Sequence, residues 1–444
     1  MATAKRQMHL GVFVLGTGNH SAGWRYEGAA TSHIELPVMR EIARIAERGK
    51  FDLLFISDSV DMDPGDHPSF LNRFEPTSLI TALSMVTTHI GLGATVSTTF
   101  SEPFNVARVF SSIDHLSSGR AAWNVVTSSN AKTALNFGMT EHMSHELRYA
   151  RAEEFVDVVR GLWDCWEADA IVADKQTGQY LDPGKVRQLN HKGRFFQVKG
   201  PLNMARCPQG HPVIIQAGGS PSGLELAART ADVVFSVVQE FAPAKAAYAD
   251  LKDRMAKYGR TPEEVAVLPG VMPIIGATEA EAREKLAKLQ SWITPSNALT
   301  LVTGRIGYDV SGYPLDGPVP PPPPSEGGQT FHRVLYEMAK RENMTLRDLY
   351  NLTAAARGHW VICGTPATIT DILEEWFTGG AADGFNILPA YFPGAFAEFV
   401  DLVVPELQRR GLFRREYQGT TLRDHFGLAP VPAPLAQRQA VGAE

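Results

Sequence analysis

The stretch GLGATVSTTFSEPFNVARVFSSIDHLSSGRAAWNVVTSSN, residues 91–130, decides the fold of this chain. Residues 90–95 and 121–127 are short apolar runs, which are typical of strands that are buried on both faces. Between them, the apolar residues of 103–116 recur at helical spacing before a Ser-Ser-Gly stop. The pattern predicts a strand–helix–strand unit.

Two parallel strands joined by a right-handed crossover end on the same side of their sheet. Residues 95–97 and 127–129, which follow or end the two predicted strands, should therefore lie side by side. Active sites of α/β barrels are built at this C-terminal edge of the strands. We expect the ligand site there.

Strand and helix patterns alternate along the rest of the chain. Further strands are predicted at residues 9–15, 51–57, 212–216, 233–236, 265–275 and 385–388. Further helices are predicted at residues 36–50, 76–87, 145–163, 223–231, 243–257, 277–291 and 395–410. Eight strands, each followed by a helix, predict a (β/α)8 TIM barrel that forms a single domain over residues 1–428.

Two long insertions interrupt this alternation, at about residues 168–211 after strand four and 295–365 after strand seven. Connections of this length are uncommon unless they cover a site. The first contains HKGRFFQVKGPLNM, which predicts short extra strands, and the second contains two predicted helices. Its proline run at 318–324 is either a polyproline ligand or a stiff spacer. Residues 429–444 are expected to be a disordered tail.

Composition narrows the functional class. The 444 residues are 44% hydrophobic and carry a net charge of -6, which gives no basic footprint for nucleic acid or an anionic membrane. Three widely spaced cysteines make neither a disulfide framework nor a zinc site, and no metal-ligand cluster is evident. We find no signal peptide or transmembrane stretch and expect a cytoplasmic protein with a small-molecule ligand.

A glycine turn follows the fifth predicted strand. Residues 216–223, QAGGSPSG, would expose backbone N–H groups at a helix N-terminus, where a phosphate binds well. The alternative is a plain tight turn that is capped by Ser220. A second glycine pair, Gly16 and Gly18, lacks the third glycine of a dinucleotide fingerprint because Ser21 stands there, so we exclude a Rossmann fold.

Four other polar residues stand at strand ends or helix starts. Asp58 ends the second strand and is either a helix cap or a ligand anchor. Asn124 lies inside the fourth strand, where its amide is satisfied within the barrel or bonds a ligand. His145 and Tyr149 are four residues apart and share a helix face, either as a surface pair or as part of the site.

These positions together resemble a known family. FDLLFISDS, HELRYARAEEFVDVVRGLWD, HPVIIQAGGSPSGLELAARTADVVFS, LVTGRIGYDVSGYPLDGPVP and GTPATITDILEEWFTGGAADGF, with the opening stretch, resemble the nitrilotriacetate monooxygenase component A group. That group belongs to the bacterial luciferase-like flavin monooxygenases and includes dibenzothiophene-sulfone, long-chain-alkane and pristinamycin IIA-forming enzymes. The resemblance covers about residues 8–425 and implies a (β/α)8 barrel.

The resemblance also implies a reaction. Reduced FMN would be a co-substrate delivered by a separate NAD(P)H:flavin reductase, and O2 would oxygenate a small organic substrate through a flavin C4a-(hydro)peroxide. We expect a homodimer or homotetramer. The second insertion would close over the site and exclude water.

The resemblance assigns roles residue by residue. It implies FMN contacts at Asp58, Thr95, Asn124, His145, Tyr149, Gly219 and Ser220. It implies catalytic roles for His20 and His332, for which a structural role is the alternative. Candidate substrate-binding residues are Trp24, Phe55, Val238 and Phe241, whose apolar character favours an aromatic or otherwise apolar substrate.

Two other functions remain open from the sequence. A deazaflavin-dependent oxidoreductase of the same barrel superfamily would transfer hydride without O2, and a cofactor titration distinguishes it. A non-catalytic flavin-binding barrel would bind the cofactor but form no product in a reductase-coupled assay.

Overall fold

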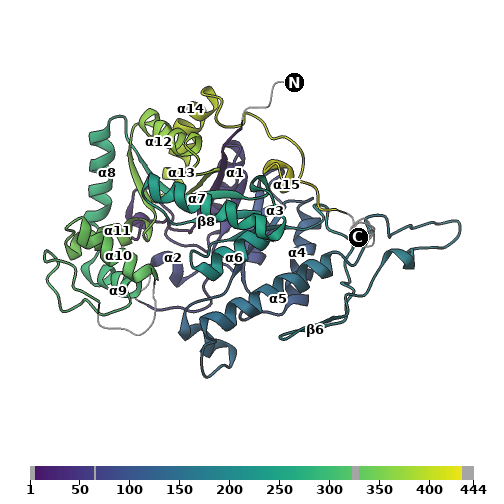
Figure 1. Ribbon diagram of the computed structural model, residues 1–444. Helices are drawn as coiled ribbons and strands as arrows, with labels where there is room; N and C mark the ends of the chain where they lie inside the picture. Colours follow the sequence, from purple (N-terminus) through teal and green to yellow (C-terminus); the bar gives the residue numbers. More distant parts are fainter. Residues whose placement is uncertain (1–5, 65–66, 323–329, 433–444) are drawn as a thin grey trace.

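The computed structural model describes residues 6–64, 67–322 and 330–432. In this part of the chain, eight parallel strands form a closed barrel (Figure 1). Their order around the barrel is β1 (His9–Val14), β2 (Leu53–Ile56), β3 (Gly91–Ser97), β4 (Ala121–Val126), β7 (Val213–Gln216), β8 (Val233–Ser236), β9 (Ala266–Ile275) and β11 (Gly384–Ile387). Strand β11 pairs back with β1 and closes the ring, which confirms the predicted (β/α)8 fold class.

The predicted strand–helix–strand unit is also confirmed. Strands β3 and β4 pair in parallel from Leu92 with Ala121 to Ser97 with Val126, and α4 (Pro103–Leu116) connects them. Helix α4 buries Val106, Ala107 and Phe110, which lie at helical spacing, and Phe110 packs against Trp123 of β4.

Further helices surround the barrel (Figure 1). Those that match the predicted ones are α1 (Leu36–Arg48), α3 (Pro76–Ser84), α5 (His145–Trp163), α6 (Pro221–Thr230), α7 (Phe241–Met255) and the C-terminal run α13 (Gly394–Glu398), a π-helical turn (Phe399–Val403) and α14 (Val404–Arg409). A four-residue helix, α2 (Pro68–Leu71), follows β2.

One predicted element has a different place. The helix predicted at 277–291 is α8 (Glu279–Ser291), but it is not the barrel helix between β9 and β11. That position belongs to α12 (Pro366–Thr378), which the sequence pattern missed. Trp376 of α12 packs edge-on against Phe241 of α7, and Arg410 after α14 pairs with Asp371 and Glu374 of α12.

An additional strand, β10, explains why α8 is not the barrel helix. Strand β9 has ten residues, and β8 pairs only with its first half, from Ala266 to Pro269. Strand β10 (Trp360–Gly364) pairs with Val271 to Ile275, the half that extends past the barrel. The backbone of that extension needs partners, and β10 supplies them. The departure from the barrel therefore runs from α8 to β10.

The second insertion, which we call the mouth insertion, has three helices among its described residues where two were expected. They are α9 (Pro295–Ile306), α10 (Thr330–Arg341) and α11 (Leu346–Ala356), and they gather beside the barrel (Figure 1). Their small core includes Val302, Ile306, Val310, Val319, Leu346, Leu349 and Tyr350. In the proline run, Val319 and Pro320 are buried, whereas Pro318, Pro321 and Pro322 are exposed; residues 323–324 lie outside the described residues.

The first insertion, which we call the hairpin insertion, lies on the opposite side of the molecule (Figure 1). Strands β5 (His191–Lys192) and β6 (Gln197–Val198) form the predicted extra strands as an antiparallel pair. Glu154 of α5 holds the pair: it accepts hydrogen bonds from the N–H groups of Phe195 and Phe196 and contacts His191 at 3.0 Å. Because the insertion follows the far end of α5, it does not cover the strand ends, contrary to expectation.

The C-terminal segment closes the other end of the barrel. Arg414 pairs with buried Asp52 beside β2, and the Tyr417 hydroxyl donates to the Phe51 carbonyl at 2.8 Å. Helix α15 (Leu422–His425) follows. Of the expected disordered tail, the carbonyls of Val431 and Pro432 accept hydrogen bonds from Arg206, and residues 433–444 lie outside the described residues. No helix within the described ranges is long and apolar enough to cross a membrane.

Candidate functional site

The C-terminal ends of β3 and β4 lie side by side, as predicted. The hydroxyls of Ser97 and Ser128 are 2.7 Å apart, and Thr99 donates to the Thr127 carbonyl at 2.8 Å. Arg148 of α5 donates to the carbonyls of both Thr127 and Ser128 at 3.0 Å. The edge is thus a fixed row of hydroxyls.

A hydrogen-bond chain crosses three strands just below this edge. Asn124 donates through Nδ2 to the Thr95 hydroxyl at 2.8 Å, and Thr95 donates to the Ile56 carbonyl at 2.9 Å. Asn124 is 3% exposed, and its Oδ1 has no hydrogen-bond partner among the described residues. An unpaired buried acceptor costs about 1–3 kcal/mol, so this atom is suited to a ligand N–H.

The glycine turn after β7 leads into α6, as predicted. The Ser220 hydroxyl caps the helix by accepting from the Gly223 N–H at 3.1 Å, and it lies 3.4 Å from the Tyr149 hydroxyl. The rings of His145 and Tyr149 are 4.7 Å apart. A methyl group at Gly218 would lie 3.0 Å from the Gly223 Cα, so the turn has little room for a larger residue. Four of the expected FMN contacts, His145, Tyr149, Gly219 and Ser220, therefore lie close together where α5 and α6 begin.

Asp58 caps no helix in the described part of the chain, where His67 and Glu75 cap the next two helices, and its role as a ligand anchor stays a prediction. Its carboxylate accepts from the Ser59 N–H at 2.9 Å and pairs with Arg73 at 3.6 Å. Burial raises the pKa of Asp58, and the Arg73 charge opposes that effect. Asp58 therefore fixes Arg73 near the end of β2.

The loop after β1 buries several polar side chains, among them Asn19, His20 and His33. His20 accepts from the Ala22 N–H through Nδ1, while its Nε2 has no partner among the described residues. Burial lowers the pKa of His20 to about 3 and that of His33 in the same loop to about 4, so both are neutral at pH 7. Because Nδ1 accepts, a neutral His20 carries its proton on Nε2 and can donate one hydrogen bond there.

Aromatic rings form a floor inside the barrel. Phe13, Phe55 and Phe235 are each the penultimate residue of their strand, and their ring centroids are 5.1 to 6.0 Å apart. His359 stacks on Phe235 at 4.9 Å. Phe55, an expected substrate contact, is buried within this floor and is 2% exposed.

The segment 357–359 was missed from the sequence. It joins α11 to β10 and brings Arg357 over the rings of Phe13 and Phe70, at 4.9 and 5.1 Å. The Gly358 carbonyl accepts from Gln239 after β8 at 2.8 Å. The one signal in the sequence was the order Arg357-Gly358 at a helix end. Glycine usually takes the left-handed position that ends a helix, and here an arginine precedes it.

The remaining expected residues are scattered. Trp24 is 42% exposed in a short 3-10 helix after β1. Val238 and Phe241 are partly buried against the main hydrophobic core, and Phe241 contacts Trp376; their substrate role stays a prediction. His332 lies in α10, and its side chain is outside the described residues.

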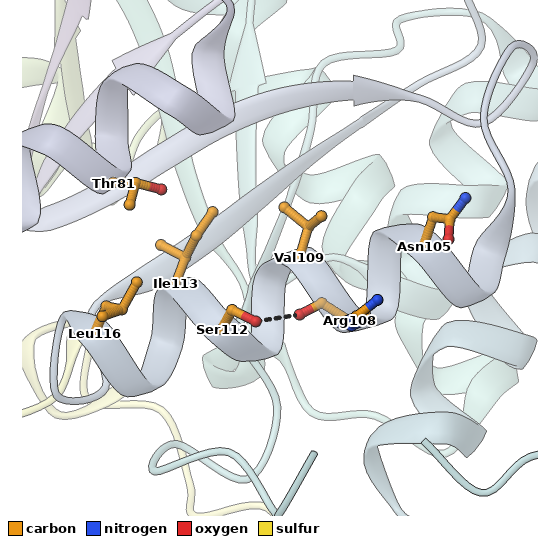
Figure 2. Close-up of a pocket in the computed structure, with 7 residues that line it drawn as sticks. All are labelled: Thr81, Asn105, Arg108, Val109, Ser112, Ile113 and Leu116. Atoms are coloured by element: carbon orange, nitrogen blue, oxygen red, sulfur yellow. Dashed lines mark hydrogen bonds between the residues drawn. The ribbon is translucent and has the colours of Figure 1, made fainter. Parts of the chain in front are cut away.

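A groove of about 380 Å³ lies elsewhere, on the outer face of α4 (Figure 2). Asn105, Arg108, Val109, Ser112, Ile113 and Leu116 of α4 line it, with Thr81 of α3. These side chains belong to the helix ring, and none comes from a strand end, so the groove is not the candidate site. Among residues 6–64, 67–322 and 330–432, no three His, Cys, Asp or Glu side chains could hold a metal ion together.

Comparison with known proteins identifies the family. A family model for luciferase-like monooxygenases matches residues 8–383. N-acetyl-S-(2-succino)cysteine monooxygenase of Bacillus subtilis (strain 168) is 50% identical over 96% of this chain and 98% of that protein. Nitrilotriacetate monooxygenase component A of Aminobacter aminovorans is 47% identical over 96% of this chain and 97% of its own. A crystal structure of a long-chain alkane monooxygenase superposes with a TM-score of 0.84 at 32% identity, covering 98% of this chain and 99% of that chain. This chain therefore belongs to the luciferase-like monooxygenase family and is a flavin-dependent monooxygenase.

Proposed function

We propose that this chain is the oxygenase of a two-component system, which uses O2 and reduced FMN from a separate NAD(P)H:flavin reductase to oxygenate a small organic substrate. The observation that carries the proposal is the Ser220 turn. It joins a helix N-terminus, a capping hydroxyl and the Tyr149 hydroxyl in one place, which is the donor set that a phosphate monoester requires.

The residues at the strand ends fit the rest of a flavin nucleotide. The buried Asn124 Oδ1 can accept from a ring N–H, and the Thr95 hydroxyl holds the Asn124 amide in that orientation. The floor of Phe13, Phe55 and Phe235 gives an apolar surface beside it. Reduced FMN, when bound, supplies the electrons that split O2 between the substrate and water.

The protein itself would hold the reacting groups in place and exclude water from them. Ser21 of the β1 loop donates to the Ala354 carbonyl of α11 at 2.9 Å, so the mouth insertion is anchored to the loop that carries His20. A neutral His20 is able to hold a proton at Nε2 next to the reacting atoms without adding charge. Shelter by the insertion would protect a reactive oxygen species from water.

The names of the relatives do not select one substrate. N-acetyl-S-(2-succino)cysteine and nitrilotriacetate are carboxylic acids, whereas a long-chain alkane is neutral. Relatives with the same fold therefore act on both charged and neutral substrates. Substrate specificity has to come from residues at the mouth of the barrel.

The proposal is tested by a reductase-coupled assay with isotope-labelled O2. The chain is mixed with NADH, FMN, an NADH:FMN reductase and each candidate substrate, and products are analysed by mass spectrometry. We expect one labelled oxygen atom in a product that appears only with the reductase. Asn124→Leu should abolish turnover, while the matched change Asn105→Leu on the outer face of α4 should not.

An anaerobic titration separates the alternatives. Reduced FMN should bind more tightly than oxidised FMN because the flavin arrives as a substrate. Tight binding of a deazaflavin with O2-independent turnover would instead make the chain a hydride-transferring oxidoreductase. Flavin binding without any product across the panel would make it a non-catalytic barrel.

A further inference from the structure

The segment 357–359, which we call the mouth strap, crosses the C-terminal end of the barrel. It is fixed at three points: Arg357 lies over Phe13 of β1, the Gly358 carbonyl binds Gln239 after β8, and His359 stacks on Phe235 of β8. One partner belongs to β1 and the other two to β8 or the residues after it, and β9 and β11 separate β1 from β8 on one side of the ring. The strap therefore spans part of the barrel opening.

The strap holds a cation against the aromatic floor. The Arg357 guanidinium is 4.9 Å from the Phe13 ring centroid and 5.1 Å from that of Phe70. Arg73 adds a second guanidinium 5.1 Å from the Phe70 ring, anchored by Asp58. Stacking engages the faces of a planar guanidinium, and its N–H donors point along its edge, which is the geometry that binds a carboxylate through two parallel hydrogen bonds.

The backbone at Arg357 is unusual for an arginine. It ends α11 in the left-handed region with a φ of 54°, and Gly358 follows with a φ of 87°. Helix ends usually place glycine in the left-handed position because a side chain is disfavoured there, and such strain gathers at functional sites. A glycine at this position would have no side chain, whereas Arg357 has its guanidinium over the Phe13 ring.

We propose that Arg357 binds an anionic group of the substrate, so that the enzyme acts on organic acids with an apolar body: the carboxylate meets Arg357 and the body lies on the floor of Phe13, Phe55 and Phe235. This inference rests on the proposed oxygenase function and names its substrate class. The sequence alone favoured a purely apolar substrate, because it gave no reason to place residues 357–359 at the site.

The test compares acids with their neutral methyl esters. The probes are N-acetyl-S-(2-succino)cysteine and nitrilotriacetate, each with its trimethyl ester, and dibenzothiophene sulfone as a neutral aromatic compound. Binding is measured by calorimetry on the protein saturated with oxidised FMN, so the readout does not depend on turnover. The variants are Arg357→Gln, which removes the charge, and Arg347→Gln as the matched control at the exposed start of α11.

We expect wild-type protein to bind at least one acid more tightly than its ester. Arg357→Gln should weaken that acid roughly ten- to a hundred-fold and leave the ester and the sulfone within two-fold. Arg347→Gln should change none of them. In wild-type protein, raising NaCl from about 50 to 500 mM should weaken the acid alone, which tests the inference even if Arg357→Gln does not fold.

Three results would overturn the inference: wild-type protein that binds esters as tightly as acids, an Arg357→Gln loss shared equally by esters, or acid binding that is insensitive to salt. Failure of the proposed function is seen separately, as acid-selective binding without any reductase-dependent product.

Discussion

The two insertions of this barrel show that length alone does not predict whether a segment serves the site. The hairpin insertion leaves from the far end of α5 and is held by Glu154, away from the strand ends. The mouth insertion is anchored to the β1 loop through Ser21 and ends in the strap that carries Arg357. The end of the barrel at which an insertion emerges decides its role.

The two ends of the barrel should differ most in how much stability they lose at acidic pH. Burial lowers the pKa of His20 to about 3 and of His33 and His425 to about 4. A folded-state pKa below the unfolded value of about 6.5 means that the unfolded chain takes up protons first. Stability should therefore be full above pH 6.5 and fall as the pH drops toward 4, by about 1.4 kcal/mol per pH unit for each histidine.

Urea unfolding at pH 7.5 and 5.5 measures this dependence. Two of the three histidines lie in the β1 loop under the mouth insertion, and His425 lies at the opposite end of the barrel. Replacing His20 and His33 together by Gln should remove more of the acid loss than His425→Gln. Equal recovery would show that the mouth is no more acid-labile than the base.

The next largest effect is on turnover, which should depend on the mouth insertion and not on the hairpin insertion. Gly270→Ala would place a methyl group 2.5 Å from His359 Nδ1 and 2.6 Å from Phe235, directly under the strap. Overpacking of this kind costs about 1–3 kcal/mol. We expect a lower melting temperature and at least a ten-fold loss of reductase-coupled turnover. Unchanged turnover in the folded variant would contradict a role for the strap.

Glu154→Ala makes the corresponding change in the hairpin insertion. It removes the acceptor of the Phe195 and Phe196 N–H groups and the partner of His191. Limited proteolysis between residues 191 and 199 should become faster, and stability should fall by about 1–2 kcal/mol. Turnover should stay within two-fold. A ten-fold loss of turnover would mean that this insertion does reach the site.

The smallest effect concerns the C-terminal end. Truncation after Ala429 removes the two carbonyls that accept from Arg206, at 3.2 and 3.0 Å. We expect a loss of about 0.5–1.5 kcal/mol in urea unfolding and no change in turnover. A larger loss would show that residues beyond Ala429 support more of the fold than these two bonds.

The sequence was sufficient for the barrel and for part of the site. Short apolar runs and helical spacing determine which segments are strands and helices, because burial imposes those patterns locally. They do not determine where a helix packs: α8 and α12 both have apolar spacing, and only the long β9 and its partner β10 decide between them. Arg357 was missed for a similar reason. Its role depends on contacts with Phe13 and Phe70, which are more than 280 residues away in the chain.

The central claim is that the Ser220 turn binds the phosphate of FMN, and Ser220→Asp tests it most directly. Aspartate caps a helix as well as serine does, so the fold should be preserved, while its charge repels a phosphate. Thr365→Asp at the N-cap of α12 is the matched control.

The measurement is the dissociation constant of FMN and of riboflavin, which lacks the phosphate, for each variant. We predict that Ser220→Asp weakens FMN binding by about a hundred-fold or more and leaves riboflavin binding within two-fold, while Thr365→Asp changes neither. Equal weakening of FMN and riboflavin by Ser220→Asp, or no weakening of FMN, would contradict the account.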